Sequence, residues 1–181
     1  MKKYFFVTAV LFIFGCSSAP KVTQNFDSNN SAKIRINHPE SGTDIVEITD
    51  GDLCDSKKSG AYFINASKST VARFKKNISL GMPKTESTSA YYGEYLIPSD
   101  KTISIMFITH KNAGSYVESC RPVSVSFDAE TGGLYEASMN TNYGKCSINI
   151  GSIKANGNEV IIDAVPTQEV KSKYFVGGCK F

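Results

Sequence analysis

Apolar and polar residues alternate along most of the chain after residue 32, a period of two that is typical of half-buried β-strands. The clearest case is 122–128, where Val123, Val125 and Phe127 alternate with small polar residues. The pattern predicts strands at 33–37, 44–49, 61–66, 91–97, 102–109, 122–128, 134–139, 160–165 and 174–176, with a further strand that begins at Cys146. Among these, 102–109 is the most apolar and is predicted to be central in its sheet.

Turn residues separate these stretches. Pro98 ends the strand at 91–97, Glu130-Thr131-Gly132-Gly133 turns the chain after 122–128, and Asn156-Gly157 is a strong type I′ hairpin signal. Within 67–86 the pattern fits either a short helix or a strand at 69–76, and Gly81-Met82-Pro83 breaks it. The fold class predicted is therefore all-β, an antiparallel β-sandwich of roughly nine short strands.

The N-terminus has a different pattern. Lys2 and Lys3 precede an apolar run from Tyr4 to Phe14 that is broken only by Thr8. A membrane-spanning helix needs about 20 apolar residues, so this run is too short to span and fits a signal peptide.

The run ends in Leu11-Phe12-Ile13-Phe14-Gly15-Cys16, which resembles the bacterial lipobox: Ile13 and Gly15 fill its aliphatic and small positions, although Phe14 is larger than usual. The resemblance implies a lipoprotein whose mature chain begins at an acylated Cys16, which is then its contact with membrane lipid. Several acyl chains on one residue anchor a protein stably. The alternative is ordinary secretion with cleavage near Ser17-Ser18-Ala19. By the same resemblance, Ser17 favours the outer membrane, with the domain facing the periplasm.

This interpretation divides the chain into a signal peptide at 1–15, the lipidated Cys16 with a polar tether to residue 32, and a domain at 33–181. The tether would reach about 20 Å. Loss of the signal peptide removes two of the 20 basic residues and none of the 17 acidic ones, so the net charge falls from +3 to +1. This balance, with no basic block, argues against nucleic-acid binding.

Cysteine usage fits export. Once Cys16 is assigned to the lipid, four cysteines remain, and an even number in an exported protein predicts two disulfides. Of the three possible pairings we favour Cys120–Cys146 and Cys54–Cys179. In this interpretation 122–128, 133–140 and the strand opened by Cys146 form a three-strand meander, so that Cys120 and Cys146 lie at the same end of it.

Motifs of catalysis are scarce: the chain has no GxSxG, HExxH or Walker-type sequence. We predict that the protein is not an enzyme and holds neither cofactor nor metal. His38, beside Pro39, is predicted to be solvated. Two weaker alternatives are a calcium loop at the Asp-rich turn with Asp50, Asp52 and Asp55, and a copper site formed by Met82, Met106, Met139 and His110.

Tyr91, Tyr92 and Tyr95 form an aromatic cluster that could bind a partner, with Tyr91 and Tyr95 on one face of a strand and Tyr92 on the other. The segments Tyr92–Pro98, Cys120-Arg121-Pro122 and 127–135, together with Cys146, resemble small Gram-negative envelope lipoproteins, which implies a β-sandwich in the envelope. The first hypothesis is a non-catalytic binding or accessory module. The second is a surface inhibitor or adhesin-like factor that contacts a protein or glycan, and a periplasmic enzyme comes third.

Overall fold

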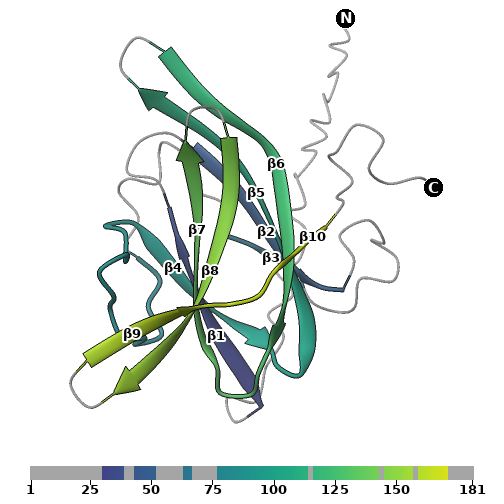
Figure 1. Ribbon diagram of the computed structural model, residues 1–181, viewed down its shortest axis with the longest axis vertical. Coiled ribbons are helices and arrows are strands. Elements are labelled where there is room, and N and C mark those ends of the chain that lie inside the picture. The colour runs from purple at the N-terminus through teal and green to yellow at the C-terminus, as the bar shows by residue number, and fades with distance from the viewer. Residues whose placement is uncertain are drawn as a thin grey trace, which may run out of the picture.

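The computed structural model describes residues 30–38, 43–51, 63–66, 77–113, 116–142, 145–156 and 159–170. These residues form two β-sheets packed face to face (Figure 1). The strands are β1 (Ser31–Asn37), β2 (Thr43–Asp50), β3 (Phe63–Asn65), β4 (Tyr92–Pro98), β5 (Lys101–Ala113), β6 (Tyr116–Ala129), β7 (Leu134–Asn142), β8 (Lys145–Asn156), β9 (Glu159–Ala164) and β10 (Gln168–Glu169). The predicted all-β sandwich is confirmed. No helix in this part of the chain is long and apolar enough to cross a membrane.

Sheet A has the strand order β4-β1-β7-β8-β9, and sheet B has the order β10-β6-β5-β2-β3. β5 is central in sheet B, as its apolar sequence predicts. One pairing departs from the antiparallel expectation, because β1 runs parallel to β7. β1 also begins at Ser31, before the start that the alternating pattern at 33–37 predicts, and β10 was not predicted at all.

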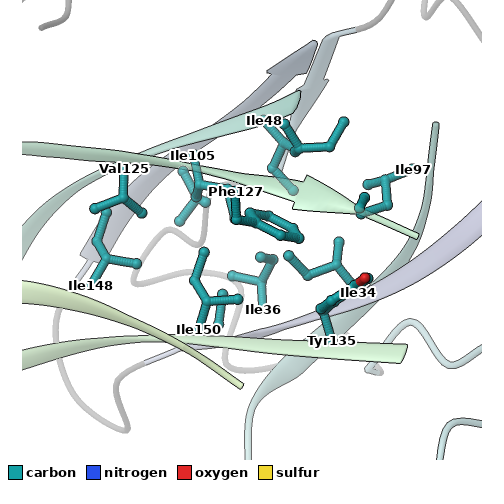
Figure 2. Packing of buried hydrophobic residues seen from close by; sticks show 14 of the residues in the cluster. Ile34, Ile36, Ile48, Ile97, Ile105, Val125, Phe127, Tyr135, Ile148 and Ile150 are labelled. Atoms are coloured by element: carbon teal, nitrogen blue, oxygen red, sulfur yellow. The ribbon is translucent and has the colours of Figure 1, made fainter. Parts of the chain in front are cut away.

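The hydrophobic core fills the space between the sheets. Along β1, β2 and β4–β8 alternate residues point inward, and Figure 2 shows side chains of the core meeting from both layers. Phe127 of sheet B lies against Tyr135 of sheet A, with ring centroids 4.9 Å apart. This tilted contact joins the layers close to the turn that connects β6 with β7. The buried cluster consists mostly of β-branched residues, namely Ile34, Ile36, Val46, Ile48, Ile97, Ile103, Ile105, Val125, Ile148 and Ile150.

The predicted meander is wrong. β6 lies in sheet B and β7 in sheet A, so the turn between them crosses from one layer to the other and does not form a hairpin. Gly132 adopts φ +73° in this turn, and the N–H of Gly133 donates to the carbonyl of Glu130. The sequence signals the turn correctly, but a turn signal does not say whether the next strand stays in the same sheet.

The predicted disulfide between Cys120 and Cys146 is confirmed, with a Cα–Cα distance of 5.9 Å. Because Cys120 belongs to β6 and Cys146 to β8, the bond joins the two sheets. It also links the β5–β6 hairpin to the β7–β8 hairpin. Cys54 and Cys179 lie outside the described residues, so their pairing stays a prediction.

Candidate functional site

A row of three charged residues crosses the outer face of sheet A. Arg35 of β1 lies opposite Glu94 of β4 on one side and opposite Glu136 of β7 on the other. In the sequence these residues occupy positions that alternate with core residues, which normally predicts exposure to solvent. All three are instead buried, with side-chain exposures of 0%, 1% and 4%.

The guanidinium of Arg35 uses every N–H that it has. Nε and Nη2 donate to Oε1 of Glu94, at 3.1 and 2.7 Å, and Nη1 donates to Oε2 of Glu136 at 3.0 Å. The remaining donors reach Oγ1 of Thr88 and the carbonyl of Met82, both at 2.9 Å. An arginine has five donors and no acceptor, so this one has no capacity left for a ligand.

Thr88 and Met82 belong to residues 77–90, a segment that we call the strap because it lies across the three charged residues. Apart from a single bridge between Ile78 and Gly93, the strap has no β-ladder. Its backbone is held instead by side chains of sheet A. Oε2 of Glu94 accepts hydrogen bonds from the backbone N–H groups of Leu80 and Met82, and from Oγ of Ser79.

Glu136 holds the other half of the strap. Its carboxylate accepts hydrogen bonds from the hydroxyls of Thr85, Ser87 and Thr88, and Oε2 also accepts from Arg35. The contacts between Glu136 and the strap connect residues 48 to 51 positions apart in the sequence. Each carboxylate is therefore shared between the arginine and the strap.

Asn37, two residues beyond Arg35 on the same face of β1, extends this docking surface. Its amide donates to the carbonyl of Ser87 and accepts from the N–H of Ser89, both at 3.1 Å. On the other side of Arg35 along β1, the ammonium of Lys33 donates to the carbonyl of Leu80 at 3.4 Å. The outward face of β1 thus contacts the strap along its length.

The environment lowers the pKa of both glutamates. Burial pushes the pKa of Glu94 up, but hydrogen bonds from Arg35 and from the N–H groups of Leu80 and Met82 outweigh it, and the pKa lies below the ordinary 4.5. For Glu136, burial again raises the pKa, and hydrogen bonds from Ser87, Arg35 and the strap threonines bring it below 4.5. Both groups are held as carboxylates, which suits them to accept hydrogen bonds rather than to supply protons.

A second polar pair lies at one end of the sandwich. Nδ1 of His38, just beyond β1, is 2.6 Å from Oδ2 of Asp44 on β2, and the two side chains are 8% and 0% exposed. The prediction that His38 is solvated is therefore wrong. The ring turns inward, on the face that carries the core, and meets a carboxylate of the opposite sheet.

The three predicted binding tyrosines are all half-buried. Tyr92 and Tyr95 lie on opposite faces of β4, as predicted, whereas Tyr91 precedes the strand. Tyr92 lies with its ring centroid 5.2 Å from the Arg35 guanidinium carbon, a cation–π contact. Tyr95 packs against the core, and burial followed by the charge of Asp44 raises its pKa. A binding role for these residues stays a prediction.

The position of the Tyr95 ring explains why residue 93 is a glycine. Its ring lies over Gly93, where an added Cβ would come within 2.5 Å of the phenol oxygen. The Gly-x-Tyr spacing on β4 therefore lets the ring lie flat along its own strand, on the side opposite Glu94.

The other candidates from the sequence are dispersed. Cys16, Asp52 and Asp55 lie outside the described residues. Met82 and Met106 are buried, whereas the side chain of His110 on β5 is exposed. Within the described ranges, no group of three or more His, Cys, Asp and Glu side chains is placed to hold a metal ion.

The arrangement of Arg35, Glu94 and Glu136 was missed from the sequence, because each residue occupies a position that normally faces water. The one available signal was the run Thr85 to Ser89, in which four hydroxyl residues surround a single charge. Such a run reads as a solvated loop, and only the fold shows that its hydroxyls meet a buried carboxylate.

Comparison with known proteins adds no assignment: no protein-family model, no curated protein and no solved structure matches the chain.

Replacement of Arg35 by Met is predicted to destabilise the protein by about 3–5 kcal/mol, because it leaves two buried carboxylates without their counter-ion. Urea denaturation monitored by circular dichroism measures the effect. The matched control is Arg121→Met, which removes an exposed arginine from β6 and should leave the unfolding midpoint unchanged. Equal midpoints for the two variants would show that the buried charges do not support the fold.

The lowered pKa values predict a loss of stability in acid. The unfolded chain takes up protons near the ordinary pKa of 4.5, whereas the folded carboxylates take them up only at lower pH. The stabilisation is therefore complete above about pH 4.5 and is lost as pH falls through the lowered folded values. Urea midpoints between pH 7 and pH 2.5 should fall less steeply in Glu136→Gln than in the wild type. Glu169→Gln, which alters an exposed carboxyl group, should keep the wild-type slope.

Proposed function

We propose that the protein is a non-catalytic binding or accessory module of the bacterial cell envelope, anchored in the membrane by an acylated Cys16. The observation that carries this proposal is the disulfide between Cys120 and Cys146. Disulfides persist in oxidising compartments such as the periplasm and are rare in the cytosol. A lipobox-like N-terminus and a disulfide inside the domain are independent features, and both favour a location in the cell envelope.

The three buried charges of sheet A have a structural role rather than a catalytic one. A catalytic residue must leave a group free to touch a substrate or to move a proton. Arg35 has every donor engaged, and both partner carboxylates accept several hydrogen bonds at once. These groups hold the strap on sheet A, which gives them a structural role.

The disulfide also supports a particular binding surface. Cys120 lies on the β5–β6 hairpin, and Cys146 is the second residue of β8, directly after the turn of the β7–β8 hairpin. In Figure 1 the β5–β6 hairpin projects past the end of the sandwich, and the β7–β8 hairpin points the same way but ends before it. A covalent bond between hairpins of different sheets holds them in a fixed relative position. Such preorganised ends lower the entropic cost of binding a partner.

Anchoring is tested by fractionation of cells that express the full-length chain. The wild type should remain with the membranes, and its Cys16 should carry acyl chains in mass spectrometry, whereas Cys16→Ser should be absent from the lipidated fraction. Ser17→Ala is the matched control and should stay membrane-bound. An unmodified thiol at Cys16 would contradict the proposed anchor.

The same preparations test the binding role. The lipidated wild type, extracted in detergent after crosslinking, should co-purify with an envelope component in a fixed stoichiometry. The double variant Cys120→Ser, Cys146→Ser, in which the hairpins are no longer tied, should retain less of that component. If the two proteins recover the envelope component in equal amounts, the tied hairpins do not form the binding surface.

A further inference from the structure

β9 forms an edge of sheet A and pairs with β8 on one side only, within the described part of the chain. In Figure 1 it projects from the body of the sandwich together with the end of β8. Two of its apolar residues, Ile161 and Ile162, are exposed by 36% and 38%. An edge strand of this kind offers unpaired backbone groups and apolar side chains together.

The direction of those backbone groups follows from one hydrogen bond. Val165, directly after β9, donates its N–H to the carbonyl of Ile150 on β8 at 2.9 Å. Along an antiparallel ladder, residues alternate between bonding to their partner strand and facing away from it. Val160, Ile162 and Ala164 therefore direct their N–H and C=O groups outward, and no described residue bonds to these groups.

The same three residues place their side chains on the outer face of sheet A. Ile162 lies across Gly151 of β8, since a Cβ added at Gly151 would be 2.2 Å from its Cγ2 atom. The opposite face of β9 is acidic, with Glu159 and Asp163, and Asp163 is paired with Lys154 at 2.7 Å. The outer face of this edge is therefore apolar, and on the opposite face Ile161 lies between the two acidic residues.

We propose that β9 pairs antiparallel with β9 of a second copy of this chain, about a two-fold axis at Ile162. A two-fold axis perpendicular to the sheet keeps each face on its own side, so residues of the same face must lie opposite each other. With the axis at Ile162, that residue faces its counterpart, and Val160 faces Ala164 of the second copy. Every outward N–H and C=O of these three residues then gains a partner, and sheet A continues through both copies.

The charges of β9 select this register. If the axis lay at Ile161, Glu159 would face Asp163 of the second copy on both sides of the axis, and like charges directly opposite are destabilising. The backbone groups of Ile161 also point back to β8. With the axis at Ile162, Asp163 faces an isoleucine, and the acidic residues do not oppose one another.

Cysteine crosslinking tests the register in the full-length chain. Ile162→Cys places two cysteines in a directly opposed, hydrogen-bonded pair, where Cα atoms are about 5.5 Å apart and a disulfide can form. The matched control is Ile161→Cys, which is equally exposed but would lie about 8 Å from its counterpart, beyond disulfide range. In cells with an oxidising envelope, a non-reducing gel should show a covalent dimer for Ile162→Cys only. No dimer for either variant, or the same yield for both, would overturn the proposal.

A second variant tests the hydrogen bonds. Ile162→Pro removes an outward N–H without breaking the β8–β9 ladder, a position at which edge strands tolerate proline. Sedimentation of the detergent-extracted full-length chain should show a wild-type dimer, and the dissociation constant should rise at least about tenfold in Ile162→Pro. Ile162→Val should dimerise like the wild type. A wild type that stays monomeric, or a proline variant that dimerises normally, would overturn the proposal.

Discussion

The structure depends on one buried arginine that two glutamates share. Arg35 lies in the middle of a three-strand row, and its ion pairs with Glu94 and Glu136 join β4 and β7 to β1. A slip of one residue in either pairing would turn a carboxylate toward the core and leave the guanidinium unpaired. Buried ion pairs add little net stability compared with well-packed apolar residues, but the loss of one partner is costly. The three charges therefore also disfavour other registers of these strands.

The position of the strap depends on the same buried charges. Residues 77–90 have almost no ladder to satisfy their backbone, and buried backbone groups need partners. Glu94, Arg35 and Asn37 supply partners for these backbone groups, and Glu136 binds the hydroxyl groups of the strap, so an irregular segment takes a fixed position on sheet A. At one end of the sandwich, two further links, between His38 and Asp44 and between Cys120 and Cys146, join the sheets to each other. The polar groups of both sites thus serve to hold parts of the structure together.

The sequence predicts strands well because alternation reflects a local property, the side of the strand on which each residue lies. The strand at 122–128 follows directly from that rule, and the antiparallel pairing of β8 with β9 follows from a second local property, the turn signal between them. The sheet to which each strand belongs does not follow from alternation, because the turn at Gly132 can lead to a strand of the other sheet as readily as to a hairpin partner. Arg35 was missed for the same reason: its burial is produced by a segment about fifty residues away. The pairing of Cys120 with Cys146 was correct although the meander behind it was wrong, since both routes bring the two cysteines to the same end.

Hydrogen exchange at Leu80 and Met82 tests the central claim most directly, because both amides donate to Glu94. At neutral pH they should exchange slowly in the wild type and much faster in Glu94→Gln, while amides of the core strand β5 keep their protection. A glutamine has one acceptor oxygen and cannot serve both the arginine and the strap. If Leu80 and Met82 exchange at the rate of free amides in the wild type, or if the substitution leaves their rates unchanged, the buried charges do not hold the strap.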